Sequence, residues 1–338
     1  MVARRSCLLA SLAMLGSCSG EPERVHAFAG PTMGSTYEVK VVGTSKQAHV
    51  AREIVELELQ SFDLAFSNWR DDSEIARVNA HRSEAPLEVS ERFADVLRTA
   101  LRVASATDGA FDPTVKPLSD LYRAAKQAPG EPLAEAALAE AAALVGHRLV
   151  TIDGLQLTKA RQGVQLDLDG IVAGAAADAI AAHLEGVGVS SFYLQITGEV
   201  LCRGFKPDGS PWRIGVVDPS SSDDEQAAVV ALPLRDAALC SSGDYRNQAV
   251  VDGAVMHHVF DPRTGRNPKQ RVASASVLAS SCAVADALGT ALMVLAPAEL
   301  ERAWPGIKRL GATGALLLLP AAGGQWNKVE LEWPSEDS

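Results

Sequence analysis

A carboxylate and a hydroxyl group stand four residues apart near the end of the chain, where their oxygens could bind a metal ion together. Asp286 and Thr290 lie in an otherwise apolar run, Cys282 to Leu295. If this run is a helix, residues four apart share a face, so both side chains project together from a mostly buried segment. Such hard oxygen ligands suit Mg²⁺, which usually keeps room for a substrate phosphate. The alternative is that Asp286 caps its helix and Thr290 bonds back to a carbonyl.

A second group of reactive side chains precedes this run, between His257 and Gly265. His258 has a pKa range that suits proton transfer near neutral pH, so it is our candidate base. The alternative is a histidine that only hydrogen-bonds within the Asp261-Pro262-Arg263 turn. We expect Arg263 to pair with Asp261 rather than bind phosphate, and His257 to be structural.

The elements that must position these groups can be predicted from periodicity and capping residues. The pattern predicts helices over 47–66, 74–79, 91–106 (capped by Ser90), 170–184, 282–295 and 297–304, and an alanine-rich helix ending at Val145. Strands are expected at 33–41, 149–152, 155–159, 164–168, 192–197, 200–203, 212–217, 229–232, 255–260, 272–279 and 315–319, and near Val329. Because the strands come in runs rather than alternating strictly with helices, we expect an α+β fold with mainly antiparallel sheets and flanking helices.

The N-terminus has the features of an export signal. Arg4 and Arg5 precede a short apolar run that ends in Leu15-Gly16-Ser17-Cys18. This is typical of a secretory signal, and the small residues before Cys18 resemble a bacterial lipobox. We therefore expect residues 1–17 to be removed, Cys18 to be lipidated, residues 18–29 to form a tether, and residues 30–335 to form a single domain on the periplasmic side of a bacterial membrane. The alternative is an ordinary signal with an incidental Cys18.

The charge balance restricts the partners. The chain of 338 residues carries a net charge of −11, with 31 basic and 42 acidic residues. Removal of residues 1–17 takes away two arginines and no acid, which leaves 29 basic residues against 42 acidic ones. This argues against nucleic acid as a partner, since nucleic acid requires a basic face. An anionic ligand must then be held by local devices, namely helix N-termini after Gly170 and Ser281, a metal, or a few basic side chains.

The cysteines do not form a metal-binding pattern. Cys202, Cys240 and Cys282 are the three that follow Cys18, and they show no C-x-x-C spacing and no paired histidines. The pattern indicates neither a zinc site nor a full disulfide framework. One bridge among the three stays open, although we expect buried thiols.

Seven separate stretches, in order along residues 30 to 300, resemble one family. They are Met33-Gly34-Ser35-Thr36; Ser67-Asn68-Trp69 with Ser73-Glu74-Ile75 and Asn79; Gly109-Ala110-Phe111-Asp112-Pro113-Thr114-Val115 with Pro117-Leu118; Asp167 to Asp178; Ser241-Ser242-Gly243-Asp244-Tyr245; His258 to Gly265; and Ala285 to Ala291. Together they resemble the ApbE-like FAD:protein FMN transferases. The resemblance implies an ApbE/T-fold-like architecture with two lobes around a central flavin cleft.

The resemblance also implies an activity and a set of site residues. The family transfers FMN from FAD to a Thr or Ser hydroxyl of an acceptor protein, with Mg²⁺, and leaves AMP. It places the metal on Asp286, Thr290 and the carbonyl of Gly170, and we take His258 and Asp286 as the catalytic residues. It implies FAD contacts, with Trp69 as a stacking face. The implied FAD contacts are Met33, Trp69, Ala110, Phe111, Asp112, Asp167, Ala173, Ser241 and Phe260. The implied partner is an acceptor flavoprotein subunit, a periplasmic or membrane redox protein.

The sequence departs from the family pattern at three places. Ala173 stands where the pattern has Lys, Thr197-Gly198-Glu199 replaces Gly-Gly-Asp, and Tyr122 replaces a Trp. The loss of the lysine removes a cation from the expected FAD site. Two alternatives to the transferase therefore stay open, namely a lipoprotein that binds FAD without transferring FMN and a pyrophosphatase that hydrolyses FAD.

Overall fold

The computed structural model describes residues 21–127, 134–221, 227–244, 248–251, 254–257, 260–268 and 270–335. Side chains of residue 126 and of 248–251 and 254–257 are outside this description. Helices and antiparallel sheets are mixed along the chain, as expected for an α+β fold. Within the described residues, no helix combines the length and the apolar character needed to cross a bilayer.

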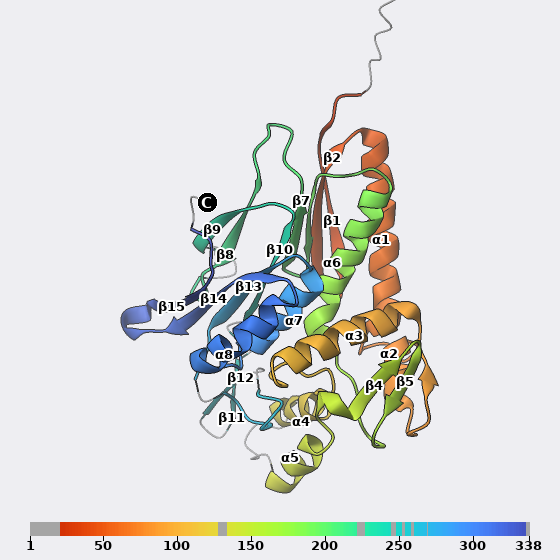
Figure 1. Cartoon of the computed structure of the whole chain (residues 1–338), viewed down its shortest axis with the longest axis vertical. Helices are drawn as coiled ribbons and strands as arrows, with labels where there is room; N and C mark the ends of the chain where they lie inside the picture. Colours follow the sequence, from red (N-terminus) through yellow and green to blue (C-terminus); the bar gives the residue numbers. More distant parts are fainter. Residues whose placement is uncertain are drawn as a thin grey trace, which may run out of the picture.

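An eight-stranded antiparallel sheet forms the main layer (Figure 1), with the order β1-β2-β6-β7-β10-β13-β14-β15. Its strands are β1 (Arg24–Thr32), β2 (Ser35–Gly43), β6 (Phe192–Ile196), β7 (Glu199–Arg203), β10 (Ala237–Gly243), β13 (Ser274–Ala279), β14 (Ala312–Pro320) and β15 (Trp326–Leu331). Alternate residues of the strands face opposite sides. The sheet therefore has two faces to cover.

Helices cover one face and a hairpin covers the other. The helical layer contains α1 (Ser45–Phe66), α3 (Glu91–Ala106), α6 (Asp169–Gly186), α7 (Cys282–Leu292) and α8 (Pro297–Lys308). The hairpin contains β8 (Trp212–Val217) and β9 (Ala228–Leu234), whose apolar residues pack with Val200, Leu239 and Leu316 of the large sheet. The two faces of the sheet thus belong to separate hydrophobic clusters.

Smaller elements complete the end of the molecule that carries α4 and α5 (Figure 1). They are α2 (Glu74–Ala80), β3 (Leu87–Glu88), α4 (Lys116–Gln127), α5 (Glu135–Ala142), β4 (Val150–Asp153), β5 (Gln156–Lys159), β11 (Gln248–Val251) and β12 (Ala254–His257). A short 3₁₀ turn lies at His147–Leu149, and a second one, at Ala322–Gly324, connects β14 to β15 of the large sheet. The three-stranded sheet has the order β3-β5-β4, and β11 pairs with β12. These elements form the second lobe beside the large sheet.

The predicted tether over 18–29 is wrong from Arg24 onward, because Arg24–Thr32 is strand β1. Phe28 is the one fully buried side chain of this strand, so the local sequence carries almost no strand pattern. Backbone pairing with β2 over nine residues holds it in place. The two strands meet at Met33 and Gly34, which both have positive φ, as a tight two-residue hairpin requires.

The predicted strand at 164–168 is also wrong. Val164, Leu166 and Leu168 are fully buried and alternate with less buried residues, so the period-two pattern is present. The partner, however, is a side chain instead of a strand: Asn79 Oδ1 accepts from the Leu166 N–H at 2.6 Å, and Asn79 Nδ2 donates to the Leu166 carbonyl at 2.9 Å. In β5, Leu157 and Gln156 pair with β3, which the sequence did not predict.

Helix α4 was missed by the sequence prediction. Leu118 is its one buried residue among those whose burial is described, so a helical stripe of apolar residues is hard to recognise. By contrast, α3 matches the predicted span of 91–106, and the Ser90 hydroxyl accepts from the Phe93 N–H at its start. Strong amphipathic periodicity with a capping residue therefore predicted this helix correctly.

Candidate active site

A cleft with two adjoining hollows lies where the helical layer meets the turns of the large sheet. The smaller hollow has a volume of about 210 Å³ and the larger one about 380 Å³. Asp169, the first residue of α6, lines both, so the two hollows adjoin at this residue. The walls contain aromatic and small residues and several aspartates.

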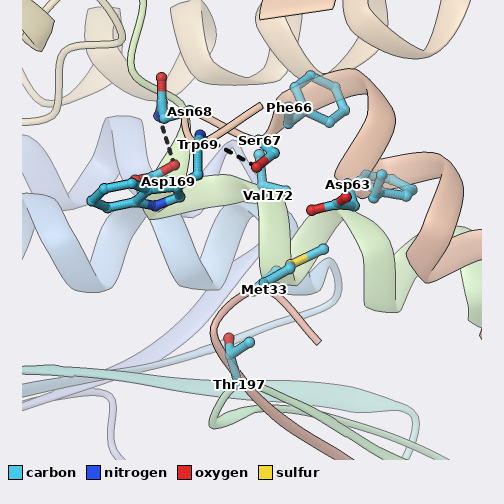
Figure 2. Close-up of a pocket in the computed structure, with 11 residues that line it drawn as sticks. Met33, Asp63, Phe66, Ser67, Asn68, Trp69, Asp169, Val172 and Thr197 are labelled. Carbon is cyan, nitrogen blue, oxygen red and sulfur yellow. Dashed lines mark hydrogen bonds between the residues drawn. The ribbon is translucent and has the colours of Figure 1, made fainter. Parts of the chain in front are cut away.

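Two hairpin turns form one side of the smaller hollow (Figure 2). Met33 lies in the β1–β2 turn and Thr197 in the β6–β7 turn, and both have positive φ. The Thr197 N–H donates to the Thr36 carbonyl at 3.0 Å, which fixes one turn against the other. Met33, which the sequence analysis expects to contact FAD, thus lines this hollow, and the contact itself stays a prediction. Ala173 of α6 lines the same hollow.

The loop after α1 forms the opposite side. Asn68 Nδ2 donates to Asp169 Oδ1 at 2.9 Å and to Asp167 Oδ1 at 3.4 Å, so this amide joins the loop to the start of α6 (Figure 2). The neighbouring Trp69 is 82% exposed, and the guanidinium of Arg123 lies 5.4 Å from its ring centre. Trp69 thus offers a ring at the rim of the cleft, as stacking on a flat ligand requires.

The predicted metal ligands converge on the contact between α6 and α7. Thr290 and Gly170 line the larger hollow, and a β-carbon on Gly170 would lie 2.9 Å from Thr290 Oγ1. Asp286 is 6% exposed, one helical turn before Thr290, and its Oδ2 accepts from the Gly174 N–H at 3.0 Å. A regular helix directs that N–H to the Gly170 carbonyl, and α6 departs from helical geometry at Gly170.

Asp286 does not cap its helix, so the alternative based on capping is wrong. The N-cap of α7 is Ser281, whose hydroxyl accepts from the Val284 N–H at 3.3 Å. Asp178 of α6 accepts from the N–H groups of Cys282 and Ala283 at 2.8 and 3.0 Å. The N–H groups at the start of α7, which the sequence analysis expected to hold an anionic ligand, therefore already have partners inside the protein.

The donor set fits a hard cation. Among the described residues, the hydrogen-bond partner of the Asp286 carboxylate is the Gly174 N–H, and neither an ion pair of Asp286 nor a hydrogen bond of the Thr290 hydroxyl is found. Burial raises the pKa of Asp286 to about 7, the Gly174 N–H opposes this rise, and the charges of Asp178 and Asp169 add to it. Within the described part of the chain, no three His, Cys, Asp or Glu side chains gather as a metal cluster. A metal here would depend on one carboxylate with hydroxyl and carbonyl oxygens, a set that suits Mg²⁺.

Asp169 adds negative charge to the middle of the cleft. Desolvation and then the neighbouring Asp167 raise the pKa of Asp169 to about 6, and the Asn68 hydrogen bond partly offsets them. Asp167 itself lines the larger hollow and accepts from the Asp169 N–H at 3.1 Å. The cleft is therefore short of positive charge.

The predicted block from Ala110 to Asp112 lines the larger hollow. The Asp112 carboxylate, however, is used inside the protein: Oδ1 accepts from the N–H and hydroxyl of Thr114 at 2.8 and 2.5 Å, and Oδ2 accepts from the His147 N–H at 2.6 Å. The carboxylate thus fixes the loop. Contact with a ligand falls to main-chain groups and to Phe111.

Phe260 lies in the same hollow, where it stacks on Tyr122 of α4 with ring centres 4.8 Å apart. The Tyr122 hydroxyl donates to the Gly265 carbonyl at 2.7 Å. These contacts tie α4 to the 260–266 turn. In that turn Arg263 makes a two-point ion pair with Asp261 and also contacts Glu299, so the predicted pairing is confirmed.

Ser241 is not among the residues that line the two hollows, and its contact with FAD stays a prediction. The Ser241 hydroxyl bonds the Ser276 hydroxyl at 2.7 Å on the neighbouring strand. The next residues, Ser242 and Gly243, line the larger hollow instead. Successive residues of a strand point to opposite faces, so a shift of one position decides which serine meets a ligand. His258 lies outside the described residues, and its role stays a prediction.

Comparison with known proteins agrees with this geometry. The profile of the ApbE family matches residues 33–310. The chain belongs to the ApbE family.

Two relatives and two solved structures illustrate how close this family relation is. The chain is 37% identical to the FAD:protein FMN transferase of Vibrio cholerae over 291 residues, covering 85% of this chain and 86% of that protein. It is 33% identical to that of Salmonella typhimurium, with 86% of each covered. The flavin transferase ApbE from Vibrio cholerae matches with a TM-score of 0.78 at 31% identity, covering 91% of this chain and 97% of that one. The apo flavinyl transferase ApbE of Pseudomonas stutzeri gives 0.78 at 33%, with 91% and 94% covered.

Membership in the ApbE family agrees with the fold predicted from the sequence. The motif blocks that carried the resemblance contribute residues to one cleft, although they are spread from Met33 to Thr290. The structure adds Asn68, Asp169, Ser119, Ser242 and Thr197, which sequence reasoning did not assign. Asn68 and Ser242 lie inside the motifs that carry the resemblance, so their polar side chains could have identified them as site residues from the sequence.

Proposed function

We propose that this member of the ApbE family transfers FMN from FAD to a Thr or Ser hydroxyl of an acceptor protein and releases AMP, with Mg²⁺ as the metal. Relatives that span most of the chain carry the name FAD:protein FMN transferase, which supports FMN transfer from FAD to a protein. The choice of hydroxyl, metal and released product is the finer part of the proposal.

One observation carries the proposal most directly: Thr290 and Gly170 lie against each other in the wall of the larger hollow, and Asp286, one helical turn before Thr290, contacts α6 at the Gly174 N–H. Two adjoining hollows suit a dinucleotide, which has a flat ring system at each end and a pyrophosphate between them. In this assignment Asp286, Thr290 Oγ1 and the Gly170 carbonyl would hold Mg²⁺. When bound, the ion supplies positive charge that neutralises the pyrophosphate.

The protein's own residues position the reactants. Trp69 offers its exposed ring for stacking, and Phe111 and Phe260 bound the larger hollow. The acceptor hydroxyl oxygen attacks the phosphorus on the FMN side, the phosphoanhydride bond breaks, and AMP leaves with the bonding electrons. We assign His258 to take the hydroxyl proton or to guide the approach of the hydroxyl. Such transfer depends mainly on positioning and charge neutralisation.

The test is a mass measurement on the acceptor. The protein is incubated with FAD, Mg²⁺ and a candidate acceptor, and the acceptor is weighed. A gain equal to one FMN residue is expected, together with AMP in solution. An unchanged acceptor with bound FAD indicates a flavin-binding lipoprotein, and release of FMN and AMP without acceptor modification indicates an FAD pyrophosphatase.

We further propose that residues 1–17 are cleaved and that lipid on Cys18 anchors the protein to the periplasmic side of a bacterial membrane. The basic start, the apolar run and the residues before Cys18 support this. The proposed partner is a periplasmic or membrane redox protein that receives the flavin. Labelling with a fatty-acid analogue tests the anchor, because Cys18→Ser should lose the label and appear in the soluble fraction.

A further inference from the structure

The cleft is short of positive charge. This matters because the proposed substrate, FAD, is an anion. Its described lining contains Asp63, Asp112, Asp167 and Asp169 but no Lys or Arg. FAD carries a doubly charged pyrophosphate, and the whole chain has a net charge of −11. Position 173, where the family pattern has Lys, is Ala173 in the smaller hollow. A cation that binds the pyrophosphate must therefore come from residues that do not line the two hollows.

Two arginines near the cleft are committed to other partners. Arg70 contacts Asp63 and Asp72, with distances of 3.2 and 2.8 Å between nitrogen and oxygen. Arg263 is held by Asp261 and Glu299. Each of these arginines faces two carboxylates, so neither leaves a net positive charge.

Helix α4 has a basic face beside the cleft. Ser119 lines the larger hollow. Lys116 precedes it by three residues and Arg123 follows it by four, so all three share one side of the helix. Both cations contact the single carboxylate of Asp120 at 3.0 Å. Lys116 and Arg123 therefore share one ion-pair partner, whereas Arg70 and Arg263 each have two carboxylates of their own.

The basic face reaches the parts of the cleft where a dinucleotide would bind. The Arg123 guanidinium lies 5.4 Å from the ring centre of Trp69, the proposed stacking surface. The charges of Arg123 and Lys116 both act on the Asp169 carboxylate, which lies between the two hollows. A cation beside a stacking ring matches a ligand in which a flat ring is joined to a phosphate.

We propose that Lys116 and Arg123 bind the pyrophosphate of FAD and thereby replace, from α4, the cation that is missing from α6 at Ala173. The inference rests on the proposed binding of FAD. In this arrangement the two side chains exchange part of their contact with Asp120 for the phosphate oxygens. Arginine suits this role because its guanidinium can donate to two phosphate oxygens at once.

Equilibrium binding tests the proposal without requiring transfer. FAD and riboflavin, which has the same ring but no phosphate, are titrated against the Mg²⁺-loaded wild type and against Lys116→Gln, Arg123→Gln and the double variant. We expect the Kd for FAD to rise about tenfold in each single variant, since a charge-assisted hydrogen bond is lost. Riboflavin binding should not change, and the salt dependence of FAD binding should weaken.

A matched control and a rescue complete the design. Arg213→Gln removes one exposed positive charge from β8, on the other face of the large sheet, and should leave FAD binding unchanged. In the double variant, Ala173→Lys should recover FAD affinity, which a merely structural role of Lys116 and Arg123 would not predict.

An unchanged Kd for FAD in the double variant would overturn the proposal, and so would an equal loss of riboflavin affinity. Failure of the rescue by Ala173→Lys would also count against it. A wild type that binds FAD but transfers nothing contradicts the proposed function and leaves this inference intact. A wild type that binds no FAD contradicts both.

Discussion

The carboxylate of Asp286 accepts a hydrogen bond from the backbone N–H of Gly174, with 3.0 Å between oxygen and nitrogen. This contact joins the middle of α7 to the first turns of α6, close to the kink at Gly170. It therefore positions one proposed metal ligand relative to another. The helix contact and the proposed metal site depend on the same few atoms.

Asp286→Asn should abolish FMN transfer while the fold survives. The amide keeps the shape of the side chain but lacks the charge that Mg²⁺ requires. We expect the transfer rate to fall by about 100-fold or more. Transfer is measured by the mass of the acceptor, and circular dichroism checks the fold. Thr290→Val removes the other side-chain ligand, the hydroxyl, and Thr290→Ser, which keeps the hydroxyl, is its matched control. Unchanged transfer in Asp286→Asn would refute the metal assignment.

The stability of the metal-free protein should depend on pH through Asp286. Burial raises the pKa of this carboxyl from 3.8 to about 7, so the folded state holds its proton more tightly than the unfolded state. Its contribution to stability is present at low pH and is lost as pH rises toward 7. In EDTA, the Tm of wild type should therefore fall more between pH 5 and pH 8 than the Tm of Asp286→Asn.

Magnesium provides the complementary measurement. Added Mg²⁺ at pH 8 should raise the Tm of wild type, because a ligand that binds only the folded state stabilises it. The Tm of Asp286→Asn should not respond. Parallel pH profiles of wild type and variant would contradict the assignment of the raised pKa.

Gly174→Ala should disrupt the packing of α6 against α7. A β-carbon at Gly174 would lie 2.4 Å from the carbonyl oxygen of Cys282, a backbone atom that cannot rotate away. We expect a loss of about 1–3 kcal/mol of stability and a weaker response to Mg²⁺. Gly186→Ala, in the same helix with no heavy atom near the added carbon, is the control and should be neutral or stabilising. Denaturant unfolding compares the two.

Asp178→Ala should weaken the start of α7. Its carboxylate accepts from the Ser281 hydroxyl at 2.7 Å and from two backbone N–H groups of α7. Loss of these bonds leaves helix-terminal donors without partners, at a cost of about 2 kcal/mol. Thermal unfolding measures the change. Asp153→Ala, which removes an exposed carboxylate, is the control, and an equal effect of both variants would exclude the capping role.

Trp69→Ala should weaken FAD binding without affecting the fold. The ring is 82% exposed, so its removal creates no cavity. Ring stacking of about 0.5–1.5 kcal/mol predicts a loss of roughly threefold to tenfold in affinity. Flavin fluorescence during titration measures this, and Trp69→Phe should lie between wild type and alanine. Full affinity in Trp69→Ala would rule out stacking on this residue.

The sequence by itself determined the features that depend on near neighbours along the chain. The capping serine and the helical period of 91–106 predicted α3, and the spacing of Asp286 and Thr290 predicted a shared helix face. The order of the motif blocks identified the family. These features follow from backbone geometry within a few residues, so they can be read without a fold.

The tertiary structure decided which partners meet across the chain. Asn79 takes the place of a strand beside Leu166, 87 residues away, and Asp178 caps a helix that starts more than 100 residues later. A one-residue alternation put Ser242 rather than Ser241 in the cleft. Local periodicity specifies a face or an element but not its partner. The partner is set by the packing of the whole sheet and its helices, because only that packing brings distant polar groups within hydrogen-bond range.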